Sequence, residues 1–169
     1  MSTQTMDWLF ERAIAWESVA RDLYATMAQW FPQEPRASRF WEELSADESR
    51  HIDFLRETRD GLSPDQLAAV LGSKELEMAR QVEAMLGRVR AEELTTLHDA
   101  YELAHDLENS EINLVFRMLT VDLLADRERQ DFLLTQINEH LNRLNRFSRE
   151  FKVRHRKLIP IRKVSPAPG

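Results

Sequence analysis

The chain has 169 residues, enough for one domain with a hydrophobic core, and it contains no cysteine, which excludes disulfide bonds, thiol catalysis and cysteine-held zinc or iron–sulfur centres. The net charge of -6 is unevenly distributed: residues 143–169 carry nine Lys and Arg against one acidic residue, a net +8, so the remainder carries -14. The acidic body argues against nucleic-acid binding, and no stretch resembles a membrane span or a signal peptide, so we expect a cytoplasmic protein.

Apolar residues recur at alternating steps of three and four along four segments, the pattern of amphipathic helices. The first stripe spans residues 6–31 and contains a single charged position, Glu17. The following FPQEP segment should end this helix, because proline does not fit a helix interior. The second stripe spans residues 40–55 and contains two polar positions, Glu48 and His51.

Shorter helices should connect the second and third stripes. Ser63 and Gln66 have the spacing of a capping box, in which each side chain caps the backbone of the other, so a short helix should begin there. A further connecting helix is expected over about residues 74–89. Thr96 and Asp99 repeat the capping spacing and mark the start of the next long helix.

The third stripe spans residues 94–119 and has Glu108 as its polar position. After a turn, a fourth stripe is expected over residues 123–144, with Arg127 and Gln130 as its polar positions. Each stripe is therefore apolar except for the one or two polar positions named above. These patterns predict an all-α protein, an antiparallel four-helix bundle with short helices between the second and third long helices.

The polar positions are expected to meet inside this bundle. A buried carboxylate is costly unless it is paired or binds a metal, so one such residue on each helix indicates a common polar layer. Glu48 and His51 lie three residues apart, on one helical face, and can offer an oxygen and a nitrogen to the same ion. We assign residues 1–147 to the bundle and residues 148–169 to a basic C-terminal extension, partly disordered.

The stretches AIAWESVARDLY, LSADESRHIDFL and AYELAHDLENSEINLVF resemble the ferritin-like, rubrerythrin-related di-iron carboxylate proteins, without their rubredoxin module. In such proteins two helices each contribute a Glu and two others each contribute Glu-x-x-His. The resemblance implies that Glu17, Glu48, His51 and Glu108 bind metal, most plausibly one or two iron ions. It further implies oxidoreductase or ferroxidase activity, a homodimer and an external electron donor.

The fourth segment departs from the family pattern. A shift of 91 residues aligns the first and third stripes, and a shift of 79 aligns the second and fourth, which places Arg127 and Gln130 where Glu and His are expected. We favour a site that still binds metal through the other helices. In a second interpretation Arg127 neutralises the carboxylates, Gln130 bonds to His51, and the bundle is a metal-free structural or interaction module. In a third, Glu128 and Asp131 turn inward, although their stripe indicates that they face solvent.

Overall fold

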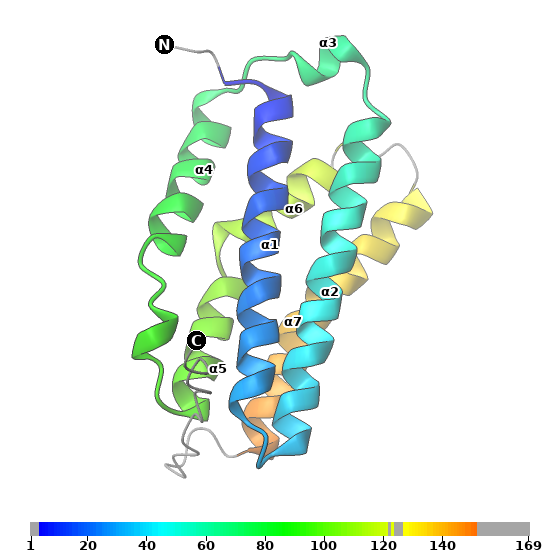
Figure 1. The fold of residues 1–169 in the computed structure, drawn as a ribbon. Coiled ribbons are helices and arrows are strands. Elements are labelled where there is room, and N and C mark those ends of the chain that lie inside the picture. The colour runs from blue at the N-terminus through cyan, green and yellow to red at the C-terminus, as the bar shows by residue number, and fades with distance from the viewer. Residues whose placement is uncertain (1–3, 122, 124–126, 152–169) are drawn as a thin grey trace, which may run out of the picture.

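The computed structural model describes residues 4–121, 123 and 127–151. Within these residues the chain forms an antiparallel helical bundle without a β-strand (Figure 1), which confirms the predicted fold class. The long helices are α1 (Met6–Trp30), α2 (Pro35–Asp60), the pair α5 (Leu97–Glu108) and α6 (Glu111–Thr120), and α7 (Arg127–Glu150). Between α2 and α5 lie α3 (Pro64–Leu67), α4 (Ser73–Leu86) and the 3-10 turn η1 (Ala91–Glu93).

The first two helices form a tight antiparallel hairpin (Figure 1). The Thr5 side chain caps the start of α1, and Pro35 occupies the first turn of α2, where a missing amide hydrogen costs nothing. The predicted stripes of both helices face the core, and Glu17, Glu48 and His51 are buried with the apolar positions around them. The hairpin therefore brings the first three predicted ligands into the core.

The connection from α2 to α5 follows the capping signals. Both predicted capping boxes form, one between Ser63 and Gln66 and one between Thr96 and Asp99. The α3–α4 linker also pairs with the chain start, because the Met6 amide donates to the Ala69 carbonyl at 2.9 Å. None of the helices in the described ranges is both long and apolar enough to cross a membrane.

The third long helix, expected as one segment over 94–119, is divided into α5 and α6. Ser110 has extended backbone, with ψ 175°, and its hydroxyl accepts a hydrogen bond from the Ile112 amide at 3.2 Å. The Asn109 side chain donates to a carbonyl four residues earlier at 2.7 Å. These short polar side chains compete with helical backbone bonds, so α5 ends directly after Glu108.

The expected register of the fourth helix is wrong. Arg127 is exposed, and the Gln130 side chain donates to the Val121 carbonyl at 3.2 Å instead of reaching the core layer. The buried side chains of α7 that the structure describes are Leu133, His140, Leu144, Phe147 and Ser148. Phe147 stacks on Phe40 of α2 with ring centroids 4.1 Å apart, so large apolar groups at the end of α7 determine its orientation.

α7 runs to Glu150, three residues past the expected bundle boundary at residue 147. Most of the expected extension, residues 152–169, lies outside the described part of the chain.

Candidate metal centre

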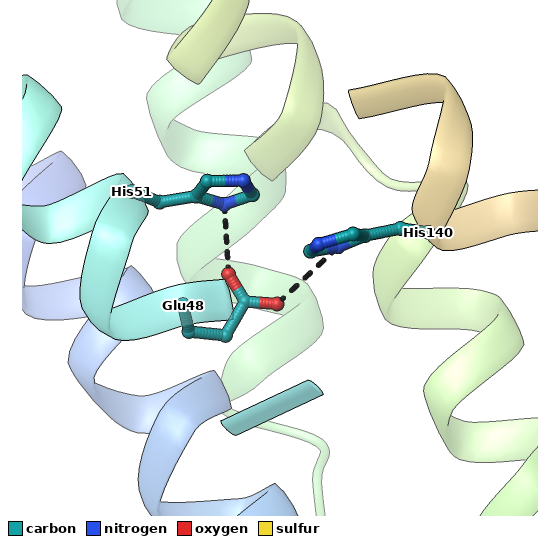
Figure 2. A group of neighbouring side chains, drawn as sticks. All are labelled: Glu48, His51 and His140. Atoms are coloured by element: carbon teal, nitrogen blue, oxygen red, sulfur yellow. Dashed lines mark ion pairs between the residues drawn. The ribbon is translucent and has the colours of Figure 1, made fainter. Parts of the chain in front are cut away.

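Side chains of the types that can bind a metal ion converge in the core from four helices. They are Glu17 from α1, Glu48 and His51 from α2, Glu108 from α5 and His140 from α7, and each is at most 5% exposed. The structure thus brings together the four predicted site residues and adds His140, which was not predicted. Figure 2 shows Glu48 between the two imidazoles of His51 and His140.

Glu48 spans the two imidazoles with its two carboxylate oxygens. Its Oε2 atom lies 2.9 Å from His51 Nδ1, and its Oε1 atom lies 3.7 Å from His140 Nδ1. Glu17 Oε2 lies 3.6 Å from His51 Nδ1, and Glu108 Oε2 lies 3.2 Å from His140 Nδ1. Each imidazole therefore directs its Nδ1 atom toward two carboxylates, an arrangement that a metal ion can use.

Glu108 is oriented by two donors besides His140. The Tyr24 hydroxyl donates to Glu108 Oε1 at 2.8 Å, and the Asn113 side chain donates to Glu108 Oε2 at 3.1 Å. Burial and the nearby charge of Glu108 raise the pKa of Tyr24, so its phenol remains a donor. Asn113 also donates to the Glu108 main-chain carbonyl at 2.6 Å, which is unoccupied by a helical bond because α5 ends there.

The cluster has more carboxylates than imidazoles to compensate them. Burial, followed by the charges of Glu17 and Glu108, raises the pKa of Glu48. Burial alone would raise the pKa of Glu108, but the hydrogen bond and charge of His140 lower it overall. Burial alone would lower the pKa of His140, but Glu108 raises it overall. The metal-free centre thus favours an ionised Glu108 beside a protonated His140, with Glu48 resisting ionisation.

The residues present fit a transition-metal ion. Glu17 Oε1 is buried and has no hydrogen-bond partner among the described residues. The carboxylates of Glu17, Glu48 and Glu108 line a small cavity with room for roughly one water molecule. Ligating atoms of Glu48, His51 and His140 lie within 4.8 Å of one another. Mixed carboxylate and imidazole donors of this kind suit iron, zinc or manganese.

The side-chain contacts that the two alternative interpretations assigned to the fourth helix are wrong. The exposed position of Arg127 excludes a buried ion-pair network with the carboxylates, and Gln130 contacts Val121 instead of His51. Glu128 and Asp131 are exposed, as their stripe indicated, so they do not complete a second half-site.

A different sequence shift would have found His140. A shift of 89 residues aligns His51 with His140 and the buried Leu44 with Leu133, whereas the shift of 79 aligns the second helix with a surface face of α7. Under the shift of 89 residues, Glu48 aligns with Ile137, a residue type that has no side-chain atom able to bind a metal. The fourth helix therefore supplies the histidine of the Glu-x-x-His pair without its glutamate.

Comparisons with known proteins bear on the family and the fold. The family model described as Rubrerythrin matches residues 9–122. A solved structure from Thermotoga maritima, a candidate ferritin-like diiron-carboxylate protein, superposes with a TM-score of 0.61 at 19% sequence identity, and the match covers 89% of this chain and 99% of that one. No protein with a curated function matches significantly.

Proposed function

The chain belongs to the rubrerythrin family, and on this premise we propose that it is a non-haem iron protein with oxidoreductase or ferroxidase activity. One observation carries the proposal: three carboxylates and two imidazoles from four helices converge in an otherwise apolar core. Unpaired carboxylates are costly in such a core, and binding a cation removes that cost.

Glu17, Glu48, His51, Glu108 and His140 would hold the iron, which supplies one-electron redox chemistry and open coordination positions when bound. Glu48 faces both imidazoles and can serve two metal positions. Tyr24 and Asn113 hold the Glu108 carboxylate in place. The surrounding side chains exclude water, as where Phe116 packs against the His51 ring with centroids 4.3 Å apart.

The charge of the donor set favours unequal occupancy. Three carboxylates compensate one divalent ion fully and a second only in part, because the fourth helix has Ile137 where a glutamate would complete the set. We infer that one ion binds tightly and a second binds more weakly. The chain has no cysteine for a built-in iron–sulfur centre, so electrons would come from an external donor. A homodimer is part of the same proposal.

Anaerobic titration with Fe²⁺ tests the proposal. The wild-type protein is expected to bind at least about one equivalent tightly, and Glu48→Ala to lose that binding. Glu42→Ala is the matched control, because Glu42 lies on the same helix with an exposed side chain. Oxidation of the bound Fe²⁺ by oxygen or peroxide then tests the redox function. A wild-type protein that binds no iron would refute the proposal.

A second pair of variants tests the role of α7. His140→Ala is expected to weaken Fe²⁺ binding, whereas Gln130→Ala, ten residues earlier on the same helix, should leave it unchanged. Equal affinities of the two variants would exclude His140 as a ligand. Sedimentation of the wild-type protein with and without Fe²⁺ tests the homodimer.

A further inference from the structure

A pocket rich in arginine lies between the start of α2 and the end of α7, at the bottom of the bundle in Figure 1. Its volume is about 450 Å³, within the range of pockets that bind small organic molecules. α2 contributes Arg36 and Arg39, and α7 contributes Arg143 and Arg146. Residues three apart share a helical face, so each helix directs a pair of guanidinium groups toward the same pocket.

The positive charge of this pocket is only partly compensated. Glu150 and Asp47 each pair with one of the four arginines. Arg39 and Arg146 are exposed, and neither forms an ion pair with another residue that the structure describes. Glu43 also lines the pocket, so four arginines stand against two glutamates among its described lining residues. In a chain of net charge -6, the pocket is therefore a local site of attraction for anions.

Aromatic rings lie directly beside these guanidinium groups. Phe147 stacks on Phe40 with centroids 4.1 Å apart and contacts Phe151 with centroids 4.5 Å apart. Phe40 and Phe151 are both partly exposed in the lining. The guanidinium carbon of Arg36 lies over the Phe151 ring, 6.0 Å from its centroid. Guanidinium groups bind phosphate through paired hydrogen bonds, and exposed aromatic faces stack on planar rings.

We propose that this pocket binds a small ligand that combines a phosphate with a planar ring, the class of the mononucleotides. Arg39 and Arg146 bind the phosphate, and the ring lies against Phe40 and Phe151. The end of the chain is unsuited to be the occupant, because residues 152–169 contain six Lys and Arg and no acidic residue. None of the five metal-centre side chains lines the pocket, so this binding goes beyond the proposed function and does not depend on it.

A simpler alternative is a solvated patch of arginines that attracts any anion. Four probes separate the two: flavin mononucleotide, riboflavin, adenosine monophosphate and inorganic phosphate. Riboflavin has the flavin ring without the phosphate, and inorganic phosphate lacks a ring. Isothermal titration calorimetry uses metal-free protein dialysed against buffer without chelator, so that neither iron nor chelator competes. Both mononucleotides should bind, and riboflavin and inorganic phosphate should each bind about 10-fold more weakly or less.

Variants then locate the site. Replacing both Arg39→Gln and Arg146→Gln should weaken binding of flavin mononucleotide about 10- to 100-fold and leave riboflavin binding unchanged. Phe151→Leu keeps an apolar side chain without a ring, and it should weaken binding of flavin mononucleotide about 10-fold while leaving inorganic phosphate unchanged. Arg56→Gln is the matched control, because Arg56 is 61% exposed and lies about 25 Å from Arg39 along the same helix. Circular dichroism checks that each variant folds.

Three results would overturn the proposal. The first is that neither mononucleotide binds the wild-type protein at about 1 mM, or that the double arginine variant binds as the wild type does. The second is that inorganic phosphate binds as tightly as flavin mononucleotide, or that Phe151→Leu has no effect, because the pocket then does not recognise a ring. The third is that a short single-stranded RNA binds the same residues more tightly than either mononucleotide, which would assign the pocket to a nucleic acid.

Discussion

Replacing Glu48 with glutamine should stabilise the metal-free protein while abolishing tight metal binding. Glu48 is buried between two imidazoles and two other carboxylates, and burial followed by the charges of Glu17 and Glu108 raises its pKa. A protonated Glu48 donates to Glu17, and glutamine provides a donor of nearly the same shape at every pH. The variant therefore keeps the hydrogen bond and removes the charge.

The magnitude follows from the charge balance of the cluster. Three glutamates face two imidazoles, and the nearby buried Asp47 is paired with Arg50 and Arg143. One glutamate therefore lacks a positively charged partner whatever the protonation of the imidazoles. An uncompensated buried polar group costs about 1–3 kcal/mol, so we expect Glu48→Gln to raise the free energy of unfolding by that amount near pH 8. For a chain of this length the melting temperature should rise about 2–4 °C for each kcal/mol.

The stability that Glu48→Gln gains over the wild-type protein should increase with pH. Because the pKa of Glu48 is raised by folding, the folded state binds more protons than the unfolded state above the ordinary glutamate value of 4.5. The charge of Glu48 therefore does not lower wild-type stability below pH 4.5, but it lowers that stability increasingly as the pH rises through the folded-state pKa of Glu48. The two proteins should be similar in stability at pH 4.5 and diverge toward pH 8.

Urea unfolding in chelator at both pH values measures this difference. Glu42→Gln, on the exposed face of α2, should change stability by less than about 0.5 kcal/mol. A Glu48→Gln protein that is no more stable than wild type at pH 8 would refute the proposed charge imbalance.

Three further predictions concern ligand binding and single hydrogen bonds. Co²⁺ at about 100 times its Kd should stabilise the wild-type protein by about 2.7 kcal/mol in thermal unfolding and leave Glu48→Gln unchanged; equal shifts would place the metal elsewhere. Tyr24→Phe removes the 2.8 Å donor to Glu108 and should lower the free energy of unfolding in urea by about 1.5–3 kcal/mol, whereas no change would exclude that bond. Burial alone would raise the pKa of Asp99, but hydrogen bonds from Thr95 and Thr96 lower it overall. In thermal unfolding, Asp99→Ala should therefore destabilise the protein at pH 7, and progressively less as the pH falls below 3.8. A destabilisation that is the same below pH 3.8 as at pH 7 would contradict this.

Three of the four helical registers could be predicted from the sequence. Glu17, Glu48 and Glu108 each lie within an apolar stripe at helical spacing, so only one face of each helix can be buried. The same periodicity gave no sign of the break between α5 and α6. The step from Glu108 to Ile112 continues the stripe, and the break depends on local capping by Ser110.

The predicted register of the fourth helix was wrong because two faces of α7 carry apolar residues. A face through Leu134 competes with the face through Leu133 and His140, and Leu144 occurs on both. The position of α7 along the bundle axis depends on where α7 begins after α6 and on the stacking of Phe147 against Phe40. The sequence repeat between the second and fourth stripes specifies neither. Asp47, whose Oδ2 atom lies 3.1 Å from His140 Nε2, was not singled out because it lies off the apolar stripe of α2, where solvent exposure is the ordinary expectation.

The distribution of the ligands along the chain affects how the centre assembles. Glu17, Glu48 and His51 belong to one hairpin closed by a short turn, whereas Glu108 and His140 follow His51 by 57 and 89 residues. Closing a short loop costs less conformational entropy than closing a long one, so we expect the hairpin contacts to form early in folding. More than half of the donors would then be in place before the C-terminal helices dock, and a cation bound there would favour the docking of Glu108 and His140.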